Sequence, residues 1–375
     1  MEEKRKGTRK KSVDFILLIS IIALVFTGLI MVFSSSWPEG MVQFNDGYHF
    51  FKSQLFAVTI GFVALIFFMN FKYTYFKKLA LPIFIVAIIL GLLILSPLGY
   101  EVKGATRWLN FGFARFMPSD AIKLGSIIFY AAFLSNKGKD IASLSKGTIP
   151  SLLIIGIACG LIYIQKDLGT TVTLAGTLIA MFFISGMNLF HLGVVGAGAA
   201  IALFYAIATP GNEYRMQRIL AFRDPFADKL GSGWQAVQSL YALGSGGIFG
   251  LGLGKSRQKF FYIPEAHNDF IFAIIGEELG LIGTVFVLFL FMLLIWRGII
   301  VAMKTEDTFG SFLATGITAL VAIQSLINIA VVTSSLPTTG ITLPFISFGG
   351  TSLLFNMAGI GILLNISRYA KLDRS

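Results

Sequence analysis

Ten apolar stretches, each long enough to cross the hydrocarbon core of a membrane, dominate this sequence. A membrane-spanning helix needs about 20 apolar residues. Runs of this kind fall near residues 14–34, 54–71, 79–97, 119–135, 149–165, 168–186, 191–209, 268–296, 309–334 and 346–366. Charged residues make up only 13% of the chain, compared with about 25% in soluble domains. The pattern predicts an all-α polytopic membrane protein with about ten transmembrane helices.

The basic amino-terminal tail predicts which side of the membrane each connection occupies. Residues 1–14 carry six Lys and Arg side chains, and such residues stay on the cytoplasmic side of a first span. No small-residue cleavage site follows the first apolar run, so we expect an uncleaved span rather than a signal peptide. We therefore expect a cytoplasmic tail over 1–13, one transmembrane domain over 14–366 and a second cytoplasmic tail over 367–375.

The longest connection, residues 210–267, is then an extracytoplasmic loop between the seventh and eighth spans. Its basic side chains are Arg215, Arg218, Arg223, Lys229, Lys255, Arg257 and Lys259. Long loops cross membranes regardless of their charge, which is one explanation for this cluster. The other is that the outer surface binds an anion, because Arg and Lys clusters commonly hold phosphate. Arg215 and Arg218 share one face of an expected helix, which fits either an anion site or an interfacial anchor.

The glycine-rich run GLGLGKS at residues 250–256 does not fit a nucleotide site. A phosphate-binding P-loop needs a glycine five residues before the glycine of its G-K-S, and Phe249 stands at that position. Glycines here would instead let the backbone approach the membrane surface or a ligand closely. The three His and one Cys lack the spacing of a zinc site. The excess of basic residues lies in connections beside membrane spans, so we expect no nucleic-acid partner.

Three other outer positions carry candidate site residues. Asp120 and Lys123 are three residues apart at the start of the fourth span, so they can pair on one helix face. Arg107 lies between two apolar segments and needs a partner or a ligand. Asp167 lies in a tight turn, where it either caps the following helix or contacts a substrate.

The segment PEAHNDF places Glu265, His267 and Asp269 at the mouth of the eighth span. Asp269 either caps that helix or acts as a base. Glu277 follows roughly 12 Å further along an α-helix, whereas paired catalytic carboxylates lie about 5–10 Å apart. A single base therefore fits better than a dyad. Buried carboxylates are costly in a membrane, so we expect Glu277 and Glu278 to face the bundle interior and bind helix ends or loops.

The stretch after the ninth span is expected to be non-helical. Pro337, Pro344 and the pair Gly349-Gly350 stop a helix and predict an extended or re-entrant loop. Within the ninth span, Gln324 and Asn328 are four residues apart, and we expect both to bond across helices.

Five blocks, taken in order, resemble the SEDS family (shape, elongation, division and sporulation). They are KGATRWL, MPSDAIKL, QKDLGT, the long stretch from YRMQRILAFRDPFADKLG to HNDFIFAIIGEELG, and LPTTGITLPFISFGGTSLL. The likeness covers nearly the whole chain and is greater to the FtsW and SpoVE type than to the RodA type. This chain has MPSD where the family commonly has QPSE, and QKD where it commonly has QPD. It also has Ser335-Leu336-Pro337 in place of a glycine-bearing turn.

The resemblance implies a function and a set of site residues. It implies glycosyl transfer on lipid II at the outer face of the bacterial cell membrane, with a class B penicillin-binding protein as partner. The family's essential aspartate corresponds to Asp269, and its paired acid and lysine correspond to Asp120 and Lys123. An enzyme of this kind polymerises lipid II into peptidoglycan during cell division, sporulation or elongation.

A mechanism joins the resemblance to the charges. Asp269 would take the proton from the acceptor sugar's 4-hydroxyl, while cations stabilise the departing pyrophosphate. The candidate substrate-binding residues are Arg107, Asp120, Lys123, Asp167, Arg215, Arg218, Lys259 and His267. No cofactor is indicated; a divalent cation could share the charge, but no ligand cluster indicates one. The alternatives are a lipid II flippase, which should show mid-membrane charges and broken helices, and a non-catalytic scaffold for cell-wall synthases.

Overall fold

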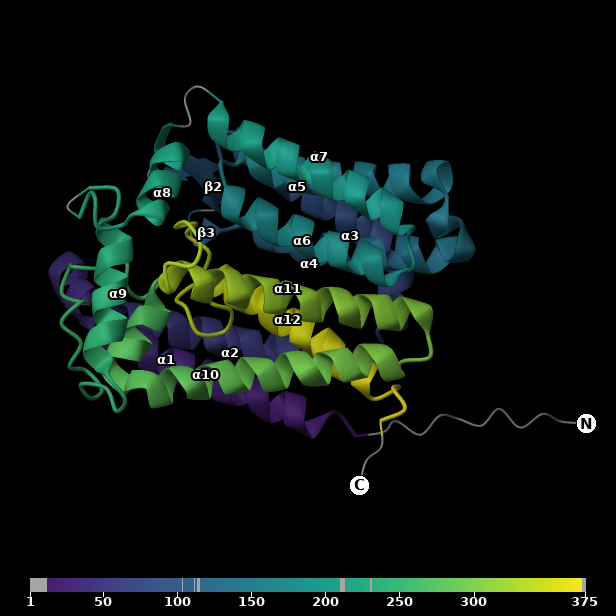
Figure 1. The fold of residues 1–375 in the computed structure, drawn as a ribbon. Helices are drawn as coiled ribbons and strands as arrows, with labels where there is room; N and C mark the ends of the chain where they lie inside the picture. Colours follow the sequence, from purple (N-terminus) through teal and green to yellow (C-terminus); the bar gives the residue numbers. More distant parts are fainter. Residues whose placement is uncertain are drawn as a thin grey trace, which may run out of the picture.

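The computed structural model is a bundle of long helices with a group of shorter elements at one end (Figure 1). It describes residues 12–102, 104–110, 112, 115–209, 213–229 and 231–372. The predicted spans correspond in order to α1 (Phe15–Phe44), α2 (His49–Asn70), α3 (Thr74–Leu92), α4 (Pro118–Lys137), α5 (Ile149–Ile164), α6 (Leu168–Ile184), α7 (Leu189–Ala208), α10 (Ile271–Lys304), α11 (Thr308–Val332) and α12 (Gly350–Ser367). The prediction of an all-α polytopic architecture is confirmed.

Length and composition separate these helices into groups. Within the described ranges, seven are long and apolar enough to cross a membrane, namely α1, α2, α3, α5, α10, α11 and α12. The apolar parts of α6 and α7 are shorter. α4 lies outside both groups and carries the charged residues Asp120, Lys123 and Lys137. The number of ten membrane crossings therefore stays a prediction.

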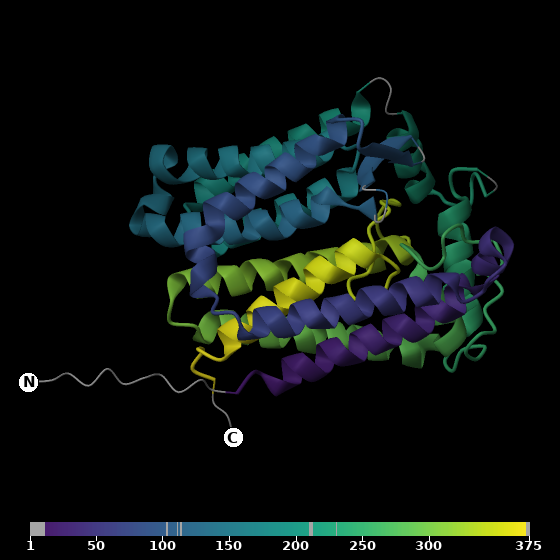
Figure 2. The same ribbon diagram turned by 180° about the vertical axis from the view of Figure 1, so that it is seen from behind.

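The start of α1 and the end of α12 lie together, at the end of the bundle opposite to α8 (Glu213–Arg223) and α9 (Trp234–Gly246) (Figures 1 and 2). There Asp14 forms an ion pair with Arg297 of α10. The backbone N–H of Lys371 donates to the carbonyl of Lys304 at 2.9 Å. We call this the tail end, and the end with α8 and α9 the cap end. The predicted topology places both tails on one side of the membrane and the loop 210–267 on the other, and it therefore requires that they lie at opposite ends of the bundle.

α11 is the central helix of the bundle. It packs against α10 and α12 and also against α4 and α6, so it joins the group formed by α1, α2, α10 and α12 to the group formed by α3 to α7 (Figure 1). Gly316 permits the close approach on the second side. A Cβ at this position would lie 2.6 Å from side-chain atoms of both Ile127 in α4 and Met181 in α6. α7, by contrast, lies at the edge of the bundle with mostly exposed side chains.

Short polar side chains begin several of these helices. Asp14 accepts the backbone N–H of Leu17 at 3.0 Å at the start of α1, and Asp307 accepts that of Gly310 at 3.0 Å at the start of α11. Such caps satisfy backbone donors that have no partner within the helix. The starts of α1 and α11 are therefore set by local sequence.

The structure differs from the expectation at three places. Residues 98–118 contain an antiparallel sheet in the order β1-β2-β3, with β1 at Gly99–Val102, β2 at Ala105–Asn110 and β3 at Arg115–Phe116. α1 continues ten residues beyond its predicted end. α10 is broken at Gly280, where φ is 66°. Short helical turns occupy η1 (Leu93–Leu95), η2 (Gly138–Ala142) and η3 (Leu144–Thr148).

Candidate active site

Asp269 lies two residues before α10 at the cap end, beside the non-helical segment that follows α11. Its side chain is half-buried. The side-chain amide of Asn328 donates to the backbone carbonyl of Asp269 at 2.7 Å and to that of Ile341 at 2.7 Å. A Cβ on Gly340 would lie 3.8 Å from Oδ2 of Asp269. Residues 333–349, which we call the 333–349 loop, therefore pass directly beside this carboxylate, as a non-helical segment of the predicted kind.

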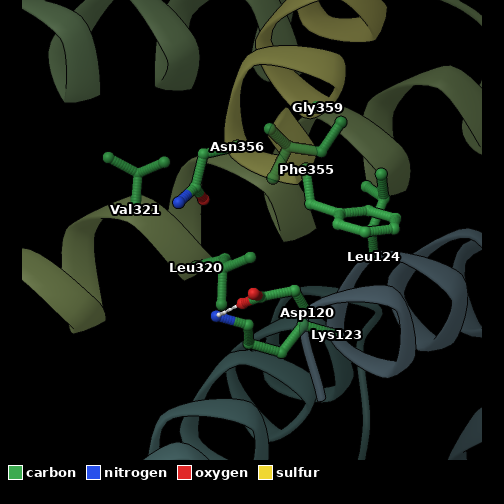
Figure 3. A pocket seen from close by; sticks show the side chains of 9 residues that line it. Asp120, Lys123, Leu124, Leu320, Val321, Phe355, Asn356 and Gly359 are labelled. Carbon is green, nitrogen blue, oxygen red and sulfur yellow. Dashed lines mark ion pairs between the residues drawn. The ribbon is translucent and has the colours of Figure 1, made fainter. Parts of the chain in front are cut away.

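Asp120 and Lys123 form a buried ion pair at the start of α4 (Figure 3). Nζ of Lys123 lies 2.9 Å from Oδ1 of Asp120, and both side chains are less than a tenth exposed. The hydroxyl of Thr351, in the first turn of α12, donates to the other carboxylate oxygen at 3.1 Å. The aspartate thus reaches the lysine, although its side chain is one methylene shorter than the glutamate that the family pattern carries.

A small cavity opens beside this ion pair. Figure 3 shows the pair on one wall, with Leu320 and Val321 of α11 and Asn356 and Gly359 of α12 around it. The wall is apolar except for the ion pair and Asn356. The low dielectric of these apolar surroundings strengthens the electric field of the ion pair in the cavity. The cavity therefore has one charged side, formed by the ion pair, and the polar amide of Asn356 lies across from it (Figure 3).

One face of α11 connects this ion pair to Asp269. Lys123 donates to the side-chain oxygen of Gln324 at 3.4 Å, and the amide nitrogen of Gln324 donates to the carbonyl of Thr342 at 3.0 Å. Asn328 lies one helical turn further and binds Asp269 and Ile341. The expectation that both amides bond across helices is confirmed for Gln324, which accepts from Lys123 of α4, whereas both amide nitrogens donate to backbone carbonyls outside the helices. In the sequence, the signal that identifies Gln324 and Asn328 is their spacing of four residues.

The 333–349 loop also contacts two other predicted site elements. Arg218 of α8 donates from Nη1 to the carbonyl of Thr338 at 3.1 Å, two residues from Gly340. The start of α6 packs on the same loop, since a Cβ on Gly169 would lie 2.9 Å from Ile341. The structure thus gathers Arg218, Asp269 and the Asp120–Lys123 pair around one loop. The helix predicted around Arg218 is confirmed as α8, while the side chain of Arg215 lies outside the described residues.

Asp167 and Arg107 have partners that shape the chain locally. Asp167 begins α6, where it accepts the backbone N–H of Thr170 at 3.0 Å and its hydroxyl at 2.8 Å; this is the capping role weighed above. Arg107 in β2 donates to the carbonyl of Lys166 at 2.7 Å, and Lys166 donates to the carbonyl of Gly104 at 3.2 Å. These bonds fasten the small sheet to the turn between α5 and α6.

Lys259 is buried in a second cluster of charges. Its ammonium lies 2.8 Å from Oε1 of Glu278, 2.7 Å from the carbonyl of Gly254 and 3.2 Å from the hydroxyl of Ser34. These three acceptors account for all three hydrogens of the ammonium group. Only 4% of the side chain is exposed. Its contacts therefore join the segment between α9 and α10 to the helices α10 and α1.

The two buried glutamates of α10 hold the same segment. Glu277 accepts the backbone N–H of Arg257 at 2.8 Å and the hydroxyl of Ser256. Glu278 accepts the hydroxyl of Ser34 at 2.6 Å and pairs with Lys259. The prediction that these carboxylates bind loops is confirmed. Among the residues that the structure describes, no three His, Cys, Asp or Glu side chains are grouped as metal ligands.

His267 is buried between aromatic rings. Its ring centroid lies 4.5 Å from that of Phe50 and 5.4 Å from that of Phe348. Burial lowers the pKa of His267 to about 4, although the nearby Glu265 carboxylate opposes this change. The imidazole is therefore neutral at pH 7. Its Nδ1 lies 3.4 Å from a carboxylate oxygen of Glu39, and this contact becomes an ion pair only when the ring is protonated.

Comparisons with known proteins agree with this fold. The family model of the FtsW/RodA/SpoVE cell cycle proteins matches residues 15–372. Stage V sporulation protein E of Bacillus subtilis (strain 168) is 44% identical over 368 residues, which cover 97% of this chain and 99% of that protein. A probable peptidoglycan glycosyltransferase FtsW of Trichlorobacter lovleyi is 41% identical over 373 residues, covering 99% of this chain and 97% of that protein.

The likeness extends to three dimensions. A chain from a peptidoglycan synthase complex, solved in work on the coordination of polymerization and crosslinking, matches with a TM-score of 0.80. The two chains are 27% identical, and the match covers 96% of this chain and 99% of the other. The chain therefore belongs to the FtsW/RodA/SpoVE family of membrane proteins, the SEDS family that its sequence motifs predict.

Proposed function

We propose that this chain is a peptidoglycan glycosyltransferase that polymerises lipid II at the outer face of the bacterial cell membrane, with Asp269 as the catalytic base. The activity class follows from relatives of about 40% identity over nearly the full chain, several of which are named as probable peptidoglycan glycosyltransferases. The observation that carries the assignment of the site is the position of the Asp269 carboxylate beside Gly340, in the loop that also binds Arg218.

The chemistry is a displacement at the anomeric carbon of the donor sugar. The acceptor's 4-hydroxyl oxygen forms the new bond to that carbon, and its proton passes to a carboxylate oxygen of Asp269. The bond from the anomeric carbon to the pyrophosphate oxygen breaks, and the lipid pyrophosphate leaves with the electron pair. Arg218 supports this step, because a guanidinium can bind the charge that develops on the leaving phosphate.

The buried ion pair of Asp120 and Lys123 has a supporting role in the site. The Asp120–Lys123 pair is too buried for Lys123 to bind an anion from solution. Gln324 connects the pair to the 333–349 loop. We assign them the role of fixing this loop, and with it the surroundings of Asp269. Arg215 remains a candidate phosphate ligand on α8. Arg107 and Asp167 are assigned to the support of the α5–α6 turn, Lys259 to the Glu278 cluster and His267 to the packing of the cap end.

The membrane topology forms part of the proposal. A polyprenyl lipid stays in the bilayer while its sugars lie outside, so the cap end must face outward and both tails inward. The basic tail supports this orientation. The partner would be a class B penicillin-binding protein, which supplies the cross-linking activity; support comes from the similarity to a chain of a peptidoglycan synthase complex.

A lipid II flippase is the second candidate, and one observation favours it. α10 is broken at Gly280, and broken helices are typical of transporters. The charges beside the break, however, are those of Glu277 and Glu278, which are occupied by Ser34, Ser256, Arg257 and Lys259. They are therefore not available to a moving substrate. The polymerase is the better supported function.

The test is polymerisation by the purified, reconstituted protein. The chain is combined with its partner penicillin-binding protein, whose transpeptidase site is inactivated, and lipid II is supplied. We expect glycan strands from the wild type and from the control Glu265→Gln, and none from a folded Asp269→Asn variant. Glu265 is a matched control because it is a carboxylate four residues away that binds Asn268. Equal polymer from Asp269→Asn would remove this residue as the base, and lipid II translocation without polymer would favour the flippase.

A further inference from the structure

A glycine-rich segment of the cap, residues 247–254, binds to α10 at its break. The backbone N–H groups of Leu251 and Gly252 donate to the carbonyls of Glu277 and Glu278 at 2.9 and 3.0 Å. In the other direction, the N–H groups of Leu281 and Ile282 donate to the carbonyls of Gly247 and Ile248 at 2.9 and 3.2 Å. The segment, which we call the glycine loop, thus fills the gap that the break leaves in the helical hydrogen-bond pattern.

Two glycines make this contact sterically feasible. A Cβ at Gly250 would lie 2.2 Å from the carbonyl oxygen of Glu278, and one at Gly280 would lie 2.3 Å from the backbone nitrogen of Gly250. Both residues also have positive φ, 79° and 66°, which favours glycine. The glycine loop and the break in α10 therefore form one structural unit.

The side chains of the glycine loop are apolar and exposed. They are Ile248, Phe249, Leu251 and Leu253, and Phe249 is 79% exposed. They adjoin Leu281 and Ile282, which are exposed on α10 just beyond the break. The paired backbone groups point inward to α10, while the apolar side chains are exposed. In this way the segment satisfies within the protein the backbone groups that face α10, as a chain segment at membrane depth requires.

The length of α10 sets the depth of the glycine loop. The charged residues Arg297 and Lys304 mark the tail end of this helix. Leu281 lies 16 residues before the first and 23 before the second, which is about 24–35 Å at 1.5 Å per residue. The hydrocarbon core of a bilayer is about 30 Å thick. When the tail-end charges lie at one edge of the core, Leu281, Ile282 and the glycine loop lie at the other.

We propose that the glycine loop is a membrane anchor that inserts into the outer edge of the bilayer. Ile248, Phe249, Leu251 and Leu253 contact lipid chains. Lys255 and Arg257, both exposed, follow at the height of the headgroups and bind their phosphates. The anchor fixes the adjoining residues 256–259, which Glu277 and Glu278 hold. This role is independent of the reaction that the chain performs.

The test measures the surroundings of single side chains in a bilayer. In a chain whose only cysteine is removed by Cys159→Ala, Phe249→Cys is labelled with an environment-sensitive NBD fluorophore. The protein is placed in nanodiscs of equal parts phosphatidylcholine and phosphatidylglycerol. Phe286→Cys, on the exposed lipid side of α10, and Lys229→Cys, exposed at the cap end, are the matched controls. Quenching is compared between lipids spin-labelled near the carbonyl and aqueous iodide.

The anchor predicts that the label at Phe249 behaves like that at Phe286. We expect lipid quenching several-fold above that at Lys229, with several-fold weaker quenching by iodide. Iodide quenching equal to that at Lys229 would show that the loop lies in water and would overturn the anchor. Protection from both quenchers would show that protein covers the loop, which also overturns it. Leu253→Cys repeats the measurement at a second site, and each variant is first required to elute as a single species.

Discussion

The side-chain amide of Asn328 and the backbone carbonyl of Asp269 are joined by a hydrogen bond of 2.7 Å between helix α11 and the entrance of α10. The same nitrogen donates to the carbonyl of Ile341 at 2.7 Å, so one amide holds the proposed base and its neighbouring loop together. Asn328 is 1% exposed, and no solvent competes for these bonds. The position of Asp269 relative to the 333–349 loop therefore depends on a residue 59 positions away.

Asn328→Leu is expected to lower both stability and polymerisation. A buried carbonyl left without a donor costs about 1–3 kcal/mol, and the Asp269 carboxylate loses its fixed position. Asn365→Leu is the matched control, because Asn365 makes comparable bonds to Met69 and Tyr73 at the tail end. Thermal unfolding and glycan synthesis per folded molecule are measured for both. An equal loss of activity in the two variants would contradict a positioning role for Asn328.

Asp120→Leu is expected to destabilise the protein more than the double change Asp120→Leu with Lys123→Met. The single change leaves the ammonium of Lys123 buried without its carboxylate, and breaking a buried pair in this way costs about 3–5 kcal/mol. The double change removes both charges. Unfolding temperature in detergent is the measurement. A double variant no more stable than the single one would contradict the dominance of the ion pair at this site.

Lys259→Met and Arg218→Gln are expected to have different effects. Lys259 is enclosed by Glu278, Ser34 and Gly254, so its loss should lower stability without raising the KM for lipid II. Arg218 is exposed beside the 333–349 loop, and its loss should raise KM. In a double-mutant cycle, Lys259 and Glu278 should couple by about 0.5–3 kcal/mol. A higher KM for Lys259→Met with unchanged stability would show that Lys259 binds the substrate.

Gly280→Ala is expected to prevent folding, whereas Gly156→Ala should be tolerated. At Gly280 the added Cβ would meet the backbone of Gly250 and the residue has positive φ. Around Gly156, in the middle of α5, no atom lies within 4 Å of the added Cβ, and alanine is favoured over glycine in a helix by about 0.5–1 kcal/mol. Yield of monodisperse protein is the measurement. Normal yield of Gly280→Ala would mean that the break in α10 is not fixed by this contact.

The stability of the protein is expected to fall between pH 6.5 and about 4 because of His267. Its pKa is lowered from 6.5 to about 4 by burial, so the unfolded chain takes up a proton in this range that the folded chain does not. Above pH 6.5 both forms are neutral and the contribution is constant; below about pH 4 both are protonated. The full effect is about 3 kcal/mol. His267→Gln should flatten the profile of unfolding temperature against pH, and the exposed control His49→Gln should leave it unchanged.

The helices could be predicted from the sequence because their signal is local. Runs of apolar residues set the lengths of α2, α5 and α11, and the capping residue Asp307 sets the start of α11. The sheet β1–β3 was missed because its strands are two to six residues long and carry no apolar alternation strong enough to identify them. The break at Gly280 was missed because a single glycine in an apolar run gives no sign that another segment will fill the gap.

The candidate site could be predicted only in part. The family resemblance identified Asp269 and the pair Asp120–Lys123. The charge of Lys259 suggested a phosphate ligand, but charge alone does not reveal that Glu278 lies 2.8 Å away. The central role of the 333–349 loop depends on contacts between distant residues, such as Arg218 with Thr338. Such contacts follow from packing, which single-sequence patterns do not contain.

α1 and α10 are fastened to each other twice, by Asp14 with Arg297 at the tail end and by Ser34 with Glu278 at the cap end. The fastenings are 20 residues apart on α1, a separation of about 30 Å, which equals the thickness of the hydrocarbon core. Helices adapt to thinner or thicker bilayers by tilting. Because these two helices are joined near both ends, we expect them to tilt as one body, and the entrance of α10 with Asp269 to keep its geometry when the lipid composition changes.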